Sequence, residues 1–185
     1  MDNNTARQSA RKKAFRASCL ERLKKASKRA YAKDRKLLNA LYEEILETDA
    51  EKIMLYLPLK TEVNLYPLIK VLRRQGRQLY VPFMEGESFR LVKYRLPLKR
   101  KKFGIKEPNN SKQYRDKDLD LAIVPIVGMD VTQRRVGFGK GMYDRFFERE
   151  EKHIKRTVFI ARELCYSQEI ITDHYDVKAD MIIMP

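Results

Sequence analysis

Apolar residues recur at helical spacing through the first quarter of the chain. Residues 6–47 contain neither glycine nor proline and are rich in Ala, Lys, Arg, Leu and Glu. The apolar positions in this segment are Phe15, Cys19, Leu23, Leu37, Leu38, Leu41 and Ile45. Because side chains three or four residues apart share a helix face, the pattern predicts one or two helices here.

After this segment, short apolar runs alternate with helical patterns. The predicted strands are Ile53–Leu57, Gln78–Pro82, Phe89–Tyr94, Leu119–Pro125, Thr157–Ala161 and Met181–Met184. Asn64 can cap a helix that extends to Gln75, with Pro67 in its first turn and Gly76 at its end. A second helix is predicted over Met142–Lys152. The turn at residues 85–87 predicts a hairpin between the second and third strands.

This order of elements predicts an α/β fold: a three-layer, Rossmann-like sandwich with a mostly parallel sheet and helices on both faces. A basic helical segment precedes it. With 185 residues and 43% apolar content, the chain can bury one core, so residues 1–185 are expected to form a single domain. Ligands of such folds bind beyond the carboxyl ends of the strands, where the loop after Pro125 lies.

Composition narrows the cellular setting. No apolar run approaches the roughly 20 residues that span a bilayer, and no secretion signal is recognisable, so a cytoplasmic protein is expected. Cys19 and Cys165 are too few and too far apart for a disulfide framework or a zinc site. Each is expected to pack as a small apolar residue, and redox chemistry is not indicated.

The net charge of +15 is concentrated in two segments. Residues 1–36 hold 13 Lys and Arg against 3 Asp and Glu, and residues 90–117 hold 11 against 2. Such a field raises the encounter rate with a polyanion: nucleic acid, a nucleotide, or a substrate with several carboxylates. Basic segments also serve simply to solvate a surface, and that reading stays open for each single lysine.

The segment Arg134–Arg145 has three alternating glycines among basic side chains. Glycines at alternate positions let backbone N–H groups converge on an anion, and the following helix start adds partial positive charge. The spacing matches neither the Rossmann nor the Walker fingerprint. The segment is therefore either a phosphate cradle, beside which Asp144 could hold magnesium, or a tight turn.

Six motifs in order resemble the 5-formyltetrahydrofolate cyclo-ligase family over nearly the whole chain. They are Lys12-x-x-x-Arg16, Leu57-Pro58-x-x-x-Glu62, Phe103-Gly104-Ile105-x-Glu107-Pro108, Asp120–Pro125, Arg135 to Asp144, and Asp176-x-Lys-x-Asp180. The resemblance implies an ATP- and Mg²⁺-dependent ligase that converts 5-formyltetrahydrofolate to 5,10-methenyltetrahydrofolate, ADP and phosphate. In the implied scheme, ATP phosphorylates the formyl oxygen, N10 attacks the activated carbon, and phosphate leaves.

The resemblance also implies a role for each matching residue. Arg135 and Lys140 would be catalytic, and Asp144 and Asp176 would hold the metal. The ATP-binding set would be Lys12, Lys13, Arg16, Arg135, Val136, Gly137, Phe138, Gly139, Lys140, Gly141, Met142 and Tyr143. The folate-binding set would be Arg16, Leu57, Glu62, Phe103, Phe138, Gly139, Lys140, Gly141 and Met142.

The motifs leave several points open. Asp173 or Asp180 could replace Asp176 at the metal, and Phe138 and Met142 depart from the residues common in the family. The expected partners are ATP and a folate whose polyglutamate tail meets the basic segments, with a monomeric protein and neither membrane nor nucleic acid as partner. The rival hypothesis is an RNA-binding module that uses the N-terminal helix, the 90–117 connection and Phe103 as a stacking aromatic.

Overall fold

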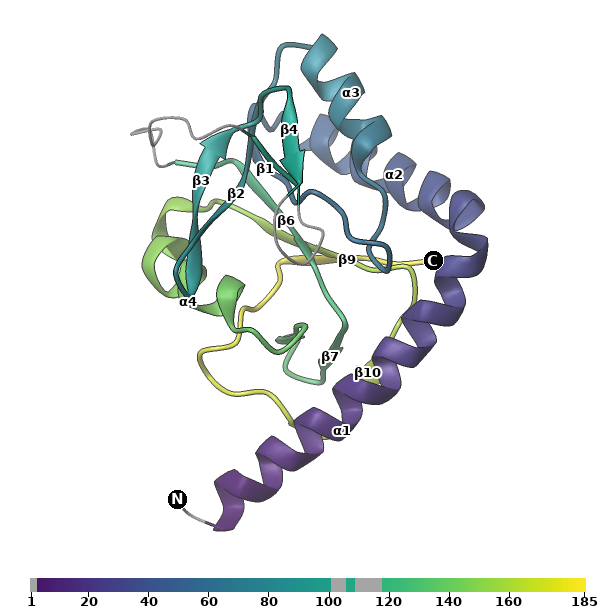
Figure 1. The fold of residues 1–185 in the computed structure, drawn as a ribbon, viewed down its shortest axis with the longest axis vertical. Coiled ribbons are helices and arrows are strands. Elements are labelled where there is room, and N and C mark those ends of the chain that lie inside the picture. Colours follow the sequence, from purple (N-terminus) through teal and green to yellow (C-terminus); the bar gives the residue numbers. More distant parts are fainter. Residues whose placement is uncertain (1–2, 101–105, 109–117) are drawn as a thin grey trace.

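The computed structural model describes residues 3–100, 106–108 and 118–185. Its centre is a six-stranded sheet in the order β11-β9-β6-β1-β2-β3 (Figure 1). These strands are β1 (Lys52–Met54), β2 (Gln78–Glu85), β3 (Ser88–Lys93), β6 (Leu121–Pro125), β9 (Thr157–Ile160) and β11 (Met181–Ile183). All neighbours pair in parallel except β2 and β3, which form the predicted hairpin.

Alternation along the strands divides the core into two layers. Ile53, Leu79, Ile123 and Val158 belong to the cluster that contains α2 (Ala30–Glu47) and α3 (Tyr66–Arg74). The next residue of each strand, Met54, Tyr80, Val124 and Phe159, packs with Phe146 and Phe147 of α4 (Met142–Glu150). Because successive side chains of a strand point to opposite faces, helices cover both sides of the sheet. The α/β class with a mainly parallel sheet is therefore confirmed.

Helix α1 (Asn3–Ala26) extends along the edge of the molecule (Figure 1). The 3₁₀ turn η1 (Ser27–Arg29) joins it to α2, so the glycine- and proline-free segment is helical as predicted. The buried face of α1 packs Cys19 and Leu23 against Val127. Among the described helices, none is long and apolar enough to cross a membrane.

Two small sheets were not predicted. In one, β7 (Gly128–Asp130) pairs in parallel with β10 (Tyr166–Ser167) and antiparallel with β8 (Arg135–Val136). In the other, β4 (Leu98–Arg100) pairs with β5 (Lys106–Pro108). Such two- and three-residue strands are too short to show a period of two in the sequence.

Most element boundaries differ from the predictions by one to three residues, and those of β1 and α3 concern the site. Strand β1 ends at Met54, although Leu55 still donates a backbone hydrogen bond to Tyr80 at 2.8 Å. Helix α3 spans Tyr66–Arg74, and Leu65 before it already has helical backbone angles, so helical backbone starts directly after the predicted cap Asn64. The Asn64 side chain accepts a hydrogen bond from the Tyr66 N–H at 3.2 Å, which is the contact expected of a capping side chain.

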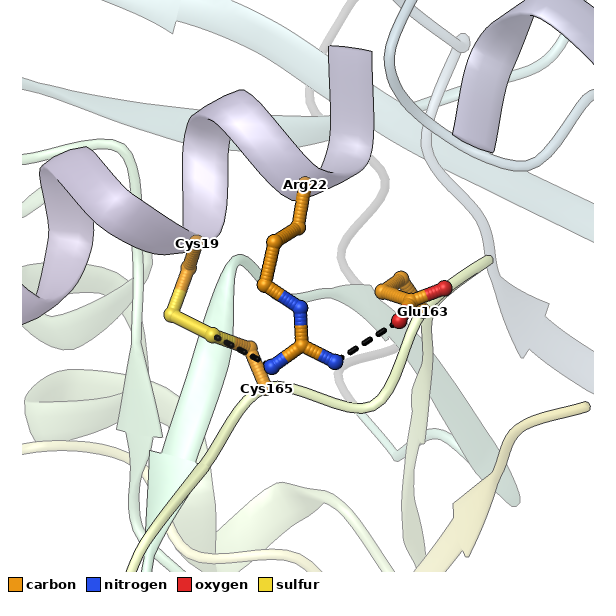
Figure 2. The surroundings of a disulfide bond; sticks show 4 residues. All are labelled: Cys19, Arg22, Glu163 and Cys165. Carbon is orange, nitrogen blue, oxygen red and sulfur yellow. Dashed lines mark hydrogen bonds and ion pairs between the residues drawn. A yellow bond between two sulfur atoms is a disulfide. The ribbon is translucent and has the colours of Figure 1, made fainter. Parts of the chain in front are cut away.

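The expectation for the cysteines was wrong. Cys19 and Cys165 form a disulfide, with their Cα atoms 5.7 Å apart across 146 residues of sequence (Figure 2). Both side chains are buried, as expected, but they are bonded to each other instead of packing as two separate small apolar residues. Sequence separation carries no information on this distance, because the packing of α1 on β7 and β10 brings the two residues together.

Candidate active site

The glycine loop, residues 137–141, joins β8 to α4 at the carboxyl edge of the sheet. Gly139 and Gly141 have φ angles of +93° and +63°, a region that side chains with a Cβ rarely enter. Gly141 is the N-cap residue of α4, and residues 138–140 are exposed. The loop therefore presents the positive end of a helix to solvent, which favours binding of an anion.

Arg16 of α1 lies directly against this loop. Its Nε donates a hydrogen bond to the Gly137 carbonyl at 2.8 Å. A Cβ added to Gly139 would lie 3.3 Å from Arg16 Nη1. The fold thus brings a guanidinium from the first helix to the glycines, more than 120 residues further along the chain.

Arg135 is committed to Asp144. It is buried, and its Nε and Nη2 donate to the two carboxylate oxygens of Asp144 at 3.1 and 3.2 Å. Its guanidinium also stacks 4.9 Å from the ring centre of Tyr143. A Cβ on Gly137 would meet Arg135 Nη1 at 2.8 Å, so glycine makes room for the pair. Arg135 therefore anchors Asp144 at the start of α4.

Lys12 lies between two carboxylates from the C-terminal segment. Its ammonium group donates to Asp176 and, at 3.0 Å, to Asp173. Asp176 is buried and also accepts the Asp173 N–H at 2.7 Å. Lys13 is exposed, so Lys12 is the residue of this pair that turns toward the site. Asp180 instead accepts the Thr157 N–H at 2.7 Å and holds β9.

The carboxylates expected to hold a metal lie among other charged and polar side chains. A hydrogen bond to Asp173, burial and the charges of Asp173, Asp176 and Asp144 raise the pKa of Tyr175 to about 12. Within the described ranges, no three His, Cys, Asp or Glu side chains lie close enough together to hold a metal ion. Mg²⁺ is commonly held by one or two carboxylates together with substrate phosphates. Asp144 and Asp176 offer oxygen ligands of this kind, and here they pair with Arg135 and Lys12.

Glu62 lies in the turn after β1. Its Oε2 accepts the Leu59 N–H at 2.7 Å. Burial raises the pKa of Glu62 to about 7, while the Leu59 N–H and the Arg162 charge oppose that shift. Burial, and next the charge of Glu62, also raise the pKa of Tyr143, the second residue of α4. The charge of Glu62 therefore acts on the first turn of α4.

The remaining predicted residues differ in accessibility. Leu57 is 8% exposed and packs in the core beneath the site. Val136 is buried, Met142 is half-buried against the α4 side of the core, and Phe138 is exposed. Lys140 is exposed, and its carbonyl accepts a hydrogen bond from Arg145 at 2.6 Å. Phe103 lies outside the described residues.

Sequence reasoning missed a buried ion pair behind the turn of Glu62. Arg162, just after β9, donates to both carboxylate oxygens of Asp34 at 2.6 and 2.8 Å. It also donates to the Lys60 carbonyl at 2.8 Å, and Asp34 accepts the Asn64 N–H at 3.0 Å. No motif signals a pair 128 residues apart, and only the position of Asp34 on the largely apolar face of α2 hints at it.

Together these features define a class: an α/β protein with an exposed, basic glycine loop at the carboxyl edge of a parallel sheet, flanked by acidic side chains. Comparison with known proteins then gives the family. The model of the 5-formyltetrahydrofolate cyclo-ligase family matches residues 8–185. The chain belongs to this family of ligases, as its motifs predicted.

Relatives agree with this assignment. The chain is 27% identical over 140 residues to the 5-formyltetrahydrofolate cyclo-ligase of Haemophilus influenzae, covering 72% of this chain and 75% of that one. It is 29% identical over 153 residues to a probable 5-formyltetrahydrofolate cyclo-ligase of Schizosaccharomyces pombe, with 73% and 75% covered.

Solved structures share the fold. The NMR structure of Aquifex aeolicus 5,10-methenyltetrahydrofolate synthetase matches with a TM-score of 0.75 and 28% identity, covering 94% of this chain and 89% of that one. The 5,10-methenyltetrahydrofolate synthetase of Mycoplasma pneumoniae matches with a TM-score of 0.67 at 23% identity, covering 93% and 97%. The second likeness supports the fold alone.

Proposed function

We propose that this protein catalyses the ATP- and Mg²⁺-dependent cyclisation of 5-formyltetrahydrofolate to 5,10-methenyltetrahydrofolate, with release of ADP and phosphate. Family membership and the names of the relatives support the reaction. The observation that carries the proposal for this chain is the meeting of three segments at one loop. Arg16 contacts the glycines, Lys12 lies on the same face of α1, and Glu62 lies near Tyr143 at the loop's end.

On this proposal the glycine loop holds the ATP phosphates. The backbone N–H groups at the start of α4, with Arg16, Lys12 and Lys140, would neutralise negative charge on the transferring phosphoryl group. A bound Mg²⁺ would supply further charge neutralisation at the phosphates, held by Asp144 and Asp176. Arg135 keeps Asp144 in place by its two hydrogen bonds.

The folate would lie on the Glu62 side of the loop. Because its pKa is about 7, Glu62 is about half protonated at neutral pH and can accept or donate a hydrogen bond at the pterin edge. Phosphorylation of the formyl oxygen turns it into a leaving group, and ring closure follows when N10 is held close to the activated carbon. No nucleophilic side chain is required by this scheme.

The cyclisation is tested with purified protein, 5-formyltetrahydrofolate, ATP and Mg²⁺, by following the absorbance of the methenyl product. Each component is omitted in turn. A signal that requires all three supports the proposal. If the folded protein gives no product yet binds RNA with a steep dependence on salt, the rival RNA-binding hypothesis replaces it. We further propose that the protein is cytoplasmic and that its active form is a monomer. Sedimentation of the purified chain tests the oligomeric state.

A further inference from the structure

A covalent link joins the first helix to the body of the protein. Cys19 lies two turns after Lys12 on α1, and Cys165 lies in the segment between β9 and β10. Their Cα atoms are 5.7 Å apart, within the usual range for a disulfide. Figure 2 shows the two side chains meeting beneath α1.

The residues around the two cysteines allow α1 and the Cys165 backbone to lie close together. Cys19 is 0% exposed and Cys165 is 4% exposed, both among apolar neighbours. At Gly128 of β7, an added Cβ would lie 2.7 Å from the Cys165 carbonyl oxygen and 2.8 Å from the Phe15 ring. A side chain at this position would push α1 and the Cys165 backbone away from β7, and with them the two sulfur atoms.

A guanidinium lies beside one of the two sulfur atoms. Arg22, one turn after Cys19, places Nη1 3.9 Å from Cys165 Sγ and donates through Nη2 to Glu163 at 2.7 Å (Figure 2). A neighbouring positive charge favours the thiolate over the thiol, and the thiolate is the reactive form in exchange. Cys165 is 4% exposed and Cys19 is 0% exposed, so Cys165 is the less completely buried of the two cysteines.

We propose that Cys19 and Cys165 are a redox modification site, which exchanges with small disulfide compounds and small thiols and which fixes the position of α1 when oxidised. On oxidation, the Cys165 thiolate attacks one sulfur of the small disulfide and releases one small thiolate. The Cys19 thiolate then attacks Cys165 Sγ and releases the second. Two protein thiols are oxidised, one small disulfide is reduced to two thiols, and the two protein protons pass to the released thiolates.

The link matters because α1 delivers Lys12 and Arg16 to the glycine loop and the C-terminal segment. Toward the start of the helix, the pair between Arg11 and Glu169 has both side chains about two-thirds exposed, and such pairs contribute little. Lys12 and Arg16 hold the helix to the C-terminal segment and the glycine loop by non-covalent contacts, and the covalent bond adds a restraint one to two turns further along the helix. Its effect on ATP binding, unlike its effect on the helix, rests on the proposed function.

The test compares the full-length chain after incubation with oxidised glutathione and after reduction with dithiothreitol. Alkylation and mass spectrometry count the free thiols. The count should be zero after oxidation and two after reduction. Trypsin should cleave α1 several-fold faster after reduction, and Tm should fall by about 5–15 °C. The Cys19→Ser/Cys165→Ser variant should match the reduced protein in both buffers. Arg22→Gln should slow the oxidation while leaving the final thiol count unchanged.

Two outcomes overturn the inference. One is two alkylated thiols in the native protein after prolonged oxidation, and the other is equal cleavage of α1 in the two redox states. Neither measurement depends on turnover. A protein that forms the bond and protects α1, yet makes no methenyl product in either state, would refute the proposed function alone. If the enzyme is active, reduction should raise its KM for ATP more than it changes kcat.

Discussion

Replacing Asp34 with Asn should strongly destabilise the protein. Asp34 is 6% exposed and Arg162 is 4% exposed, so the change leaves a buried guanidinium without its counter-charge. It also replaces one of the two oxygens that receive Arg162 at 2.6 and 2.8 Å with an NH₂ group, a second donor. Removing one partner of a buried pair costs about 3–5 kcal/mol, and for a domain of this size that lowers Tm by about 6–20 °C.

The assay is thermal and urea unfolding of wild type and variant at pH 7, followed by circular dichroism. Asp49→Asn is the matched control, because Asp49 pairs with Arg77 at 2.8 Å but its side chain is 83% exposed. The φ angle of Asp49 is +44°, which asparagine tolerates well. This control should change the free energy of unfolding by less than about 1 kcal/mol.

The reasoning would be refuted if Asp34→Asn melted as close to wild type as Asp49→Asn does. A double-mutant cycle adds a second criterion. Asp34→Leu combined with Arg162→Met removes both charges, and it should cost less than the sum of the single changes. Strictly additive costs would mean that the two side chains do not interact. Turnover should fall in the single variants, because Arg162 also holds the Lys60 carbonyl in the turn of Glu62.

Four further predictions concern the site. The pKa of Glu62 is raised to about 7 from 4.5, so its contribution to stability is complete below pH 4.5 and is lost as pH rises through 7. Glu62→Gln should therefore remove a decline of up to about 3 kcal/mol over that interval in urea unfolding, and an unchanged slope would contradict the burial argument. Asp144→Asn should cut turnover strongly and lower Tm by a few degrees; an unaltered rate and magnesium titration would remove Asp144 from the metal role. Lys140→Ala should raise the KM for ATP more than that for folate, and an effect confined to folate would reverse the assignment. Gly137→Ala should separate Arg135 from Asp144 and lower kcat, whereas full activity would show that the guanidinium moves aside without consequence.

Local sequence patterns predicted most elements of the main sheet and the helices. Apolar spacing over residues 6–47 predicted α1 and α2, and the buried run before Pro125 predicted β6, because a helix face and a strand core each need a periodic set of apolar side chains. The boundaries of α3 differ from the prediction by one residue at each end, because the ends of helices are defined only to within a residue or two. The pairs of β7, β8 and β10 have no local signal, because two or three residues show no period.

The site divides in the same way. Its glycine loop could be found from the sequence, because a cradle for phosphate needs closely spaced residues without Cβ atoms, and the six motifs located the family. The partners within the site could not. That Lys12 meets Asp176 and Asp173, that Arg135 holds Asp144, and that burial shifts the pKa of Glu62 all follow from contacts or burial created by the folded chain.

By itself, therefore, the sequence determined the helices and the strands of the main sheet, and it singled out the glycine loop as the candidate phosphate site. The tertiary structure decided which charges neutralise each other and that Cys19 meets Cys165. The physical reason is the sequence distance over which each interaction acts. Backbone preference and side-chain periodicity act within a few residues, whereas an ion pair such as Asp34 with Arg162 depends on a distance that is set only when the core packs.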